Sequence, residues 1–499
     1  MKYVLPVLAA SVGVLPSQAG TPRGGNDREG QHPNVLFLMV DDMNGYGVME
    51  RYPDIITPNL QRLRSQSVNF ANNCCASPVS TPSRTSFLSG LYPHHTGGYL
   101  NGCDAWSNNP QMADPSKVET LPECFKKNGY ETWGRGKTFH SPLPQERLEA
   151  MYDNRPLYQG GFGPFYEGEY QGGTKFFAIR PWDDSKDDEH PDNKNTEAAI
   201  EFFSQQHDKP FLMCLGLWKP HCPYTSPKRF FDLYKDKKLP LPKGFKPGDL
   251  DDVPDMGRNM VDSLARFKYD GTPESETLWR QFLEAYCANN SFADWNIGRV
   301  LDALDNSPYA DNTIVVFCSD NGYHCGEKLR WEKGTMWEQS AYCPMMIRLP
   351  KSMREQEKFR PNKGATCEVP VGLIDIYPTL VDLCGLTPPV QKLDGESMRS
   401  LLMNPKMKSD RINLTTYSEN LSSVRDVRYR LITYPDGTQE LYDLKKDPYE
   451  WKNLIGDDKY KEVVARLEKR IPTTWAKSLG GRFEVAKQQR ESAKKSLKK

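Results

Sequence analysis

The sequence has no excess of charge of either sign. Lysine and arginine together number 65, and so do aspartate and glutamate, which gives a formal net charge of zero. A strong overall field would attract nucleic acid or an anionic membrane surface, and this balanced chain has none. We therefore expect no nucleic-acid partner and no membrane partner, and a charged substrate must be recognised by a local group of side chains.

Long apolar runs are missing beyond the first residues. Residues 4–15 are apolar, follow a single lysine and precede a small-x-small pattern that ends at Ala19. This run is shorter than the roughly 20 residues that span a bilayer, so we predict a signal peptide over residues 1–19 and a polar linker over residues 20–31. A buried N-terminal strand is the alternative. The prediction places the mature chain in the periplasm or outside the cell.

Paired cysteine motifs are absent as well. The chain has 12 cysteines but no CxxC pair and no regular spacing typical of a disulfide framework. Cys214, Cys287 and Cys318 lie in apolar segments and are predicted to be packed thiols. For the adjacent Cys74 and Cys75, the sequence leaves open whether either is bonded. Histidine is scarce too, since only eight occur and none belongs to an HExxH motif, which argues against a two-zinc hydrolase.

Apolar runs alternate with helical patterns along most of the chain. Continuous apolar runs, typical of strands buried on both faces, occur at residues 34–42, 209–218 and 312–320. Helical patterns occur at residues 57–67, 121–130 and 275–304, the first with Thr57 as its N-cap. We therefore predict an α/β fold, with a catalytic domain over residues 32–400 whose central, mostly parallel mixed sheet is flanked by helices.

The pattern changes in the last hundred residues. The segments INLTTYSE, VRDVRYRLITY and TQELYDL are short and β-like, a PDG turn occupies residues 435–437, and a helical pattern follows at residues 459–471. We predict a smaller C-terminal α+β domain over residues 401–499, with an antiparallel sheet, a covering helix and a solvated basic tail.

Acidic side chains follow two of the predicted buried strands. Asp41 and Asp42 end the first, whereas Asp320 and Asn321 end another. Parallel strands bring their carboxyl ends to one edge of a sheet, so these side chains are expected to lie together. Hard oxygen ligands without a local histidine or cysteine cluster select Ca²⁺ or Mg²⁺ over zinc. Capping of the helices that follow each strand is the alternative.

A hydroxyl-rich segment, VSTPSRTSFLSG, occupies residues 79–90. Ser80, followed after one residue by Pro-Ser-Arg and then by Leu-Ser-Gly, resembles the signature of the sulfatase family. The resemblance implies that Ser80 is converted after translation to formylglycine and that Arg84 holds the modified side chain and helps to neutralise sulfate. A serine hydroxyl is a poor nucleophile, whereas an aldehyde hydrate beside a metal loses a proton easily. A capped helix with proline in its first turn is the alternative.

The resemblance covers nearly the whole mature chain. The segments NVLFLMVDD, TPNLQRL, GRGKTFH, WKPHCPY, SDNGYHCGEK, WEKGTMWE and LYDLKKDPYEWKNL follow one another as they do in sulfatases. The chain looks most similar to the branch that includes iduronate-2-sulfatase, although GEKLRW at residues 326–331 departs from the GEHGEW of that enzyme. The resemblance implies an alkaline phosphatase-like fold and a sulfuric ester hydrolase.

Further site residues are carried over from the family pattern. By resemblance, the cation, Ca²⁺ in preference to Mg²⁺, is bound by Asp41, Asp42, Asp320, Asn321 and the modified Ser80. The cations and acids around sulfate would be Lys137, His140, Lys219, His221 and Lys333, with His221 preferred as the acid that protonates the leaving alcohol. Residues proposed to contact the sugar are Asp104, Trp106, Trp218, His324 and Arg330. Solvated lysines and packed histidines or tryptophans are the alternatives.

The resemblance implies removal of O-sulfate from a sulfated carbohydrate, derived from a glycosaminoglycan or another polysaccharide. Because the residue to be modified is serine, it also implies a radical-SAM maturase as a partner during biogenesis. Two alternatives stay open: a phosphate or phosphonate ester hydrolase of the same superfamily, and a non-catalytic glycan-binding homologue in which Ser80 is unmodified.

Overall fold

A computed structural model describes residues 32–480 apart from residues 50, 53, 104, 141–142, 155–160, 164–176, 263–268 and 357–363. The predicted signal peptide, the linker and the basic tail lie outside the described residues. The described residues from Pro33 onward form one compact unit. Within the described part, no helix is both long and apolar enough to cross a bilayer.

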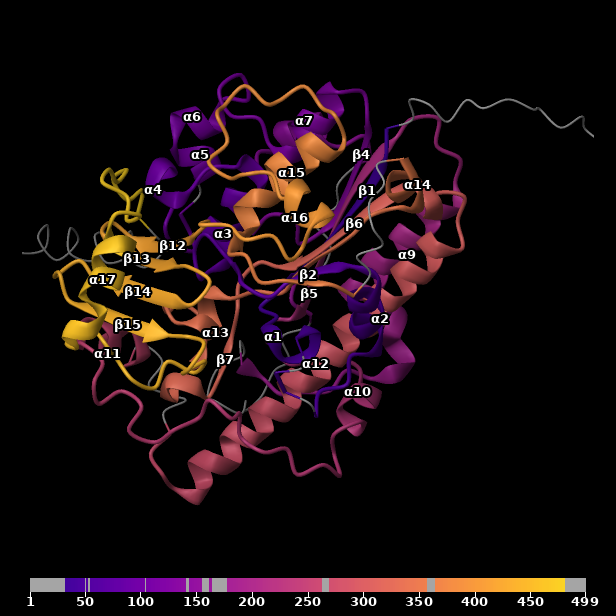
Figure 1. Ribbon diagram of the computed structural model, residues 1–499. Coiled ribbons are helices and arrows are strands. Elements are labelled where there is room, and N and C mark those ends of the chain that lie inside the picture. The colour runs from indigo at the N-terminus through magenta and orange to yellow at the C-terminus, as the bar shows by residue number, and fades with distance from the viewer. Residues whose placement is uncertain are drawn as a thin grey trace, which may run out of the picture. The chain divides into compact units, whose positions relative to one another are not determined.

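A seven-stranded mixed sheet forms the centre of this unit (Figure 1). Its strands lie in the order β10 (Thr366–Cys367), β2 (Val68–Phe70), β9 (Met345–Arg348), β6 (Thr313–Ser319), β1 (Asn34–Asp41), β5 (Phe211–Pro220) and β4 (Glu131–Gly136). Strands β6, β1, β5 and β4 are mutually parallel, whereas β9 is antiparallel to both of its neighbours. The predicted mostly parallel mixed sheet is confirmed, and the four parallel strands end at one edge.

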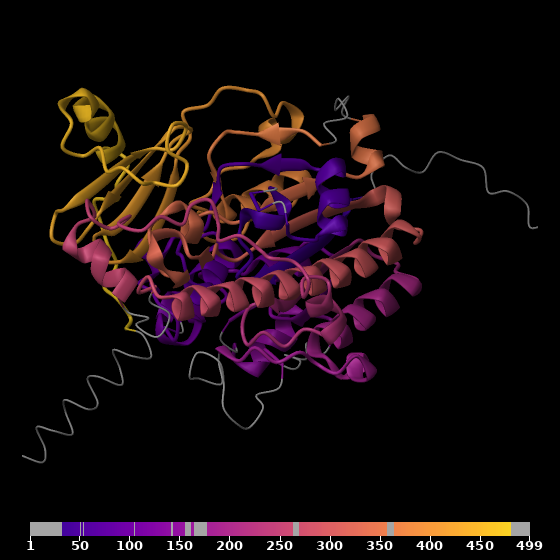
Figure 2. The same cartoon turned by 90° about the horizontal axis from the view of Figure 1, so that it is seen from below.

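Helices cover both faces of the sheet (Figures 1 and 2). Alternate residues of β1 point to opposite sides, so Val35 and Phe37 enter one apolar core and Leu36 and Leu38 enter the other. The first core is built with α3 (Ser80–Ser89), α5 (Ala105–Asn108), α6 (Pro110–Ala113), α7 (Leu121–Lys127), α8 (Gln145–Met151), α14 (Lys351–Gln356), α15 (Ile376–Leu383) and α16 (Arg399–Met403). The second is built with α1 (Gly45–Val48), α2 (Pro58–Gln66), α9 (Pro191–Ser204) and α12 (Pro273–Asp305).

The long helix α12 confirms the helix predicted over residues 275–304. The Thr272 side chain accepts a hydrogen bond from the Ser275 amide, and Pro273 takes the first helical position, so the chain carries its own start signal. The stretch from residue 285 to residue 294 is buried on every side. Thr57 likewise is the N-cap residue of α2, although its side chain makes no capping bond.

The C-terminal part contains a four-stranded antiparallel sheet of β12 (Asn413–Ser418), β13 (Leu421–Arg425), β14 (Tyr429–Thr433) and β15 (Gln439–Asp443). Helix α17 (Lys461–Glu468) covers the sheet through a buried apolar cluster, which consists of Leu414, Val424, Leu431, Leu441 and Leu467. The predicted antiparallel sheet with a covering helix is confirmed. The segment VRDVRYRLITY, expected as one β-like run, instead spans the end of β13, a turn and all of β14.

All twelve cysteines lie in the described residues, where they are buried and keep free thiol groups without a disulfide. This confirms Cys214, Cys287 and Cys318 as packed thiols. It also answers the question that the sequence left open, because neither Cys74 nor Cys75 is bonded to another cysteine.

Candidate active site

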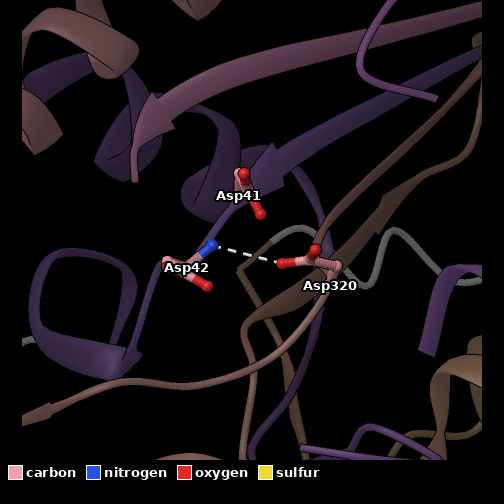
Figure 3. Close-up of side chains that lie close together, drawn as sticks. All are labelled: Asp41, Asp42 and Asp320. Atoms are coloured by element: carbon pink, nitrogen blue, oxygen red, sulfur yellow. Dashed lines mark hydrogen bonds between the residues drawn. The ribbon is translucent and has the colours of Figure 1, made fainter. Parts of the chain in front are cut away.

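Three buried carboxylates meet at the edge where the parallel strands end. Asp41 is the last residue of β1, Asp42 follows it, and Asp320 follows β6 (Figure 3). One oxygen from each lies within 4.8 Å of the others, and all three residues are fully buried. The Asp42 amide donates to Asp320 Oδ1 over 3.1 Å, which joins the ends of the two strands.

The acidic residues do not cap the helix that follows β1. Asn44 is the N-cap residue of α1, and its side chain accepts a hydrogen bond from the Tyr46 amide. Asp42 takes a left-handed backbone conformation, with φ of 64°, and its carbonyl accepts a hydrogen bond of 2.8 Å from the Tyr286 hydroxyl. The loop is thereby held so that both carboxylates face the cluster, and the capping alternative does not describe this site.

Ser80 lies at the first position of α3, beside the carboxylates. Its Oγ is 3.2 Å from Asp41 Oδ1 and 3.4 Å from Asn321 Oδ1. The N-cap residue of α3 is Val79, whose side chain makes no capping bond, so the Ser80 hydroxyl faces the acidic cluster and is not the cap. All ten residues of α3 are buried. The side-chain amide of Asn321 donates from Nδ2 to Asp42 Oδ1 over 2.8 Å, so Asn321 belongs to the same oxygen-rich group.

Arg84, one turn along α3, holds the strand ends together. Its Nε donates to Asp320 Oδ2 over 2.8 Å and its Nη2 donates to the Val40 carbonyl over 3.2 Å. Its Nη1 donates to the Lys137 carbonyl. This guanidinium therefore links α3 to the ends of β1, β4 and β6.

Two lysines neutralise the carboxylates. The Lys137 ammonium, just after β4, donates to Asp41 Oδ2, and the Lys333 ammonium donates to Asp42 Oδ2. The position of Lys137 depends on two glycines. A Cβ at Gly136 would lie 2.0 Å from the Gly216 carbonyl oxygen, and a Cβ at Gly216 would lie 2.0 Å from the Lys137 carbonyl oxygen. Neither position has room for a side chain.

These charges set the pKa values of the cluster. Burial alone would raise the pKa of Asp41, but Lys137, Arg84 and Lys333 hold it below its usual value. For Asp42, burial outweighs Lys333, and Asp41 and Asp320 add repulsion, which raises the pKa to about 7. A divalent cation would favour the ionised form of all three carboxylates.

The two predicted histidines lie in an environment that favours the neutral ring. His221 Nε2 is 3.5 Å from Asp42 Oδ2, and burial followed by Lys333 and Lys137 holds its pKa well below the usual value. Burial followed by Lys137 and Arg84 lowers the pKa of His140 to about 2. The role of His221 as a proton donor stays a prediction, which this environment does not favour.

Lys219 is placed differently from the other two lysines. Its ammonium donates to the backbone carbonyls of Phe162, His221 and Pro223, so it braces the chain that carries His221. Burial lowers the pKa of Lys219 to about 8 despite the nearby Asp192. No contact with the carboxylate cluster is among its hydrogen bonds in the described structure.

Three of the residues predicted to contact the sugar are buried, each with protein partners of its own. Trp106 is buried against Phe139 and beneath Arg147. His324 is fully buried, with its ring nitrogens 2.7 Å from Thr335 Oγ1 and 3.1 Å from the Glu327 carbonyl oxygen. The Arg330 guanidinium donates to the carbonyls of Lys333, Met260 and Val261. Asp104 lies outside the described residues, and these four assignments stay predictions.

Trp218 does lie at the site, together with Phe162, a residue that sequence reasoning missed. The Lys137 ammonium is 5.2 Å from the Phe162 ring centroid and 5.6 Å from that of Trp218. Asp192 was also missed, and its carboxylate accepts the amides of Trp218 and Lys219 over 2.8 and 3.0 Å. An aromatic residue in a glycine-rich loop and an acidic residue in a helix carry no recognisable signal, so the sequence offers no means of finding them.

The donor set fits a hard divalent cation. Three carboxylates and the Asn321 side-chain oxygen supply oxygen ligands, and no histidine or cysteine among the described residues belongs to this group. Lys137 and Lys333 supply positive charge next to the carboxylates. Such a set suits Ca²⁺ or Mg²⁺.

Comparison with known proteins agrees with this geometry. The family model "Sulfatase" matches residues 33–386, and a model described as "N-sulphoglucosamine sulphohydrolase, C-terminal" matches residues 326–477. A "Sulfatase" of Formosa agariphila is 34% identical over 90% of this chain and 88% of its own length. Human iduronate 2-sulfatase is 29% identical over 71% of this chain and 70% of its own length.

Two solved structures share the fold. One, of a protein "in complex with its substrate D-Glucosamine-2-N, 6-O-disulfate", has a TM-score of 0.66 at 22% identity and covers 88% of this chain and 97% of its own. The phosphonate monoester hydrolase of Agrobacterium radiobacter also has a TM-score of 0.66, at 21% identity, and covers 88% of this chain and 94% of its own.

Fold and site first define a class, an α/β enzyme with an acidic, oxygen-rich site at the carboxyl ends of its parallel strands. Within this class the chain belongs to the sulfatase family and is a sulfuric ester hydrolase. The family and fold implied by the residues around Ser80 are thereby confirmed.

Proposed function

We propose that the protein removes O-sulfate from a sulfated saccharide, with Ser80, converted to formylglycine, as its nucleophile. One observation carries the proposal: the Ser80 hydroxyl lies within 3.4 Å of both Asp41 and Asn321 and is not used to cap its helix. Val79 occupies the cap position, so a capping role does not explain why the Ser80 hydroxyl faces the cluster.

The side chains around Ser80 have separate proposed roles. When bound, Ca²⁺, held by Asp41, Asp42, Asp320 and Asn321, would polarise a sulfate oxygen and ease deprotonation at residue 80. Lys137 and Lys333 lie beside those carboxylates and can neutralise the charge that develops on the sulfate oxygens. Arg84 fixes the strand ends and so keeps these groups in place.

The modification explains how turnover is completed. One hydroxyl of a hydrated aldehyde attacks sulfur and displaces the alcohol, and loss of the proton from the other hydroxyl then expels sulfate and restores the aldehyde. Unmodified serine has no second hydroxyl and would remain sulfated.

The saccharide class is supported by relatives. The similar proteins include an "Ulvan-active sulfatase" of Formosa agariphila and two iduronate 2-sulfatases. The test is a screen of defined sulfated and phosphorylated saccharides with protein purified from its native host. Release of sulfate from a saccharide supports the proposal. Release of phosphate alone would favour the phosphonate and phosphate ester alternative.

Mass analysis of the peptide that carries residue 80 tests the nucleophile separately. The proposal requires serine to lose two hydrogen atoms in material matured by the native host. Unaltered serine together with tight binding of glycans would favour the non-catalytic homologue.

We further propose that the chain is exported and is modified before export by a radical-SAM maturase. The supporting observations are the apolar run at residues 4–15 and the serine at position 80. N-terminal sequencing of the protein from native host cells should find a chain that begins after Ala19. A retained N-terminus would contradict the export step.

A further inference from the structure

The segment that leads to Lys333 has an unusual backbone. Between residues 328 and 332, three residues other than glycine take left-handed conformations, with φ of 55° at Lys328, 51° at Leu329 and 78° at Glu332. Such conformations are uncommon for residues with long side chains, cost free energy and cluster at functional sites. The two charged residues among them differ in what their side chains contact.

At Lys328 the contacts that compensate for the strain are visible. The fully buried ammonium donates to Asp249 Oδ1 over 3.1 Å and to the Glu450 carbonyl. Glu332, which ends β8 (Trp331–Glu332), differs, because its carboxylate makes no hydrogen bond or ion pair within the described part of the chain. No side-chain partner in the protein therefore offsets the strain at Glu332.

Hydrogen bonds hold the chain after Glu332 close to the segment that carries Ser80. The Gly334 amide donates over 3.1 Å to the carbonyl of Pro78, two residues before Ser80. The same amide donates over 2.9 Å to a hydroxyl of α13 (Glu338–Ala341). The turn at Glu332 is thereby tied to the segment of the nucleophile.

Of the two lysines at the acidic cluster, Lys333 is the more accessible. The Lys137 side chain is fully buried and that of Lys333 is 10% exposed, although both donate to carboxylates of the cluster. The neighbouring Glu332 is partly exposed, and yet burial raises its pKa, with Lys333 and Arg330 opposing the shift. A bound substrate can reach a carboxylate that is surrounded by protein but still in contact with solvent.

Tyr417, which belongs to β12 of the C-terminal sheet, lies on the same side. Its hydroxyl would be 3.1 Å from a Cβ at Gly334, and the residue is partly exposed. Burial raises the pKa of Tyr417, Arg330 opposes this shift and Glu332 adds to it, so the hydroxyl and the carboxylate are neighbours. Among the described residues, the Tyr417 hydroxyl has no hydrogen-bond partner.

The chemistry of these groups determines which ligand they can bind. Lys333 and Arg330 favour the ionised form of Glu332. An ionised carboxylate only accepts hydrogen bonds, whereas a phenol hydroxyl donates and accepts them. A sugar hydroxyl has the hydrogen that Glu332 requires. A second carboxylate has none to donate and carries the same charge, so it is disfavoured at this position.

Given the proposed removal of O-sulfate from saccharides, on which this inference rests, we propose that Glu332 is a specificity-determining residue. It accepts hydrogen bonds from hydroxyl groups of the substrate, with Tyr417 beside it, and thereby selects a sulfated neutral sugar over a sulfated uronic acid. The strained conformation of Glu332 serves substrate recognition and not the stability of the fold.

Steady-state kinetics with host-matured protein test the selection. The probes are methyl glycosides of monosulfated neutral hexoses and of monosulfated uronic acids. We expect kcat/KM to be at least about 10-fold higher for the best neutral probe than for the best uronic acid. An equal or higher kcat/KM for a uronic acid would overturn the selection. Absence of sulfate release from these probes and from every saccharide of the wider screen would instead contradict the proposed function itself.

Glu332→Gln keeps the size of the side chain and removes its charge. It should lower kcat/KM for the best neutral probe about 10-fold, mainly through KM, and should bring the ratio between neutral and uronic probes close to one. Glu284→Gln is the matched control, because Glu284 of α12 is also partly exposed and burial also raises its pKa, and it should change neither value. An unchanged ratio in Glu332→Gln, with normal sulfate release by the wild-type protein, would refute the role of Glu332 alone.

Glu332→Gly separates recognition from folding. Glycine adopts the left-handed conformation without strain, so the melting temperature should not fall, whereas kcat/KM for the neutral probe should fall at least as far as in Glu332→Gln. A lower melting temperature with unchanged kinetics would show a structural role and overturn the proposal. Tyr417→Phe should lower kcat/KM about 3-fold. Its control is Tyr429→Phe, in a partly exposed tyrosine of the same sheet, and equal kinetics of the two variants would remove Tyr417 from the proposal.

Discussion

Arg84 and Lys137 are both cations at the acidic cluster, yet they have different roles. Arg84 uses its donors on protein groups, namely the Asp320 carboxylate and the carbonyls at two strand ends. The Lys137 ammonium donates to a carboxylate oxygen, that of Asp41, and to no other group among the described hydrogen bonds. We therefore propose that Arg84 is a positioning residue and that Lys137 and Lys333 are the cations that face the substrate.

Replacement of Ser80 separates chemistry from folding. Ser80→Ala should abolish sulfate release by host-matured protein, because no hydroxyl remains to be oxidised, and should change the melting temperature little. Sulfate release is followed by ion chromatography. The control is Ser86→Ala, a buried serine of the same helix, which should stay active. Turnover by Ser80→Ala would remove Ser80 from the mechanism.

Arg84→Lys tests the positioning role. A lysine cannot reach the Asp320 carboxylate and two strand carbonyls together, so kcat should fall about 100-fold or more. Because the carboxylates would be less well held, the affinity for Ca²⁺, measured by calorimetry, should also fall. Normal kcat and normal Ca²⁺ affinity would contradict the role.

The sequence predicted the acidic residues at the strand ends correctly. It did not predict which way the cationic side chains around them point. Asp41, Asp42, Asp320 and Asn321 meet as expected because a buried apolar run followed by acidic residues identifies both a strand and its carboxyl end. Lys219 and Arg330 carry the same charge as Lys137, and only the folded chain shows that their donors face backbone carbonyls. Side-chain direction in a loop has no periodic signal.

At the scale of elements, the end of β4 lies too close to the middle of β5 for a side chain to fit between them. Gly136 has φ of 68° and no space for a Cβ, because the Gly216 carbonyl oxygen would lie 2.0 Å from it. Gly129, before β4, has φ of 85° and nothing within 4 Å of a Cβ. The two glycines share a left-handed conformation and differ in their surroundings.

This difference gives a controlled prediction. Gly129→Ala should cost about 1 kcal/mol of stability, the cost of the backbone conformation alone. Gly136→Ala should cost more and should also lower kcat, because the strands must separate and Lys137 moves with them. Urea denaturation and steady-state kinetics measure the two effects. Equal behaviour of the two variants would show that the close approach does not matter.

The hydrogen bond between His95 and Asp394 is expected to stabilise the short helix α4 (Pro93–Thr96) in a pH-dependent way. His95 Nδ1 lies 2.7 Å from Asp394 Oδ2, and this hydrogen bond raises the pKa of the half-exposed imidazole. A raised pKa means that the pair stabilises the fold below pH 6.5 and that this contribution disappears as the pH rises through the pKa of folded His95.

His95→Gln should therefore lower the melting temperature at about pH 6 and leave it unchanged at about pH 9. The effect should be at most about 1 kcal/mol, since the pair is partly exposed to solvent. A larger loss of stability at the higher pH than at the lower would contradict the sign of the shift.

The sequence predicted secondary-structure elements best where they were long and where capping residues, proline or glycine marked their ends. Helix α12 begins at a threonine cap followed by proline, and its predicted range lies inside the observed one. The run VRDVRYRLITY contained no glycine or proline, so its turn was hidden, although the Asp426 carboxylate accepts the amides of Arg428 and Tyr429 and forms that turn.

In the whole molecule, buried ion pairs join the C-terminal sheet to the part that carries the active site. Arg425 and Arg430, from β13 and β14, pair with Glu338 of α13, and Arg430 also pairs with Glu450. The Thr416 amide donates to the Ala76 carbonyl, four residues before Ser80. The change to short β-like segments from about residue 411 was visible in the sequence. The connection between these distant segments was not.

We therefore expect the chain to unfold in a single transition. Arg430→Met should lower stability by about 3–5 kcal/mol, because it leaves two buried carboxylates short of a partner. Arg428→Met removes a partly exposed arginine of the same sheet and should change stability far less, because solvent screens its ion pair with Asp443. Thermal denaturation followed by near-ultraviolet and far-ultraviolet circular dichroism should give one midpoint for each protein. Separate midpoints for the two signals would show independent domains.

The buried thiols, all twelve of them without a disulfide, free the fold from the redox state of its surroundings. No covalent crosslink has to form before the chain is native, and none can be lost to a reductant afterwards. A chain of this kind can mature in the glutathione-rich cytosol or in an oxidising exterior and reach the same native structure, without help from enzymes of oxidative folding.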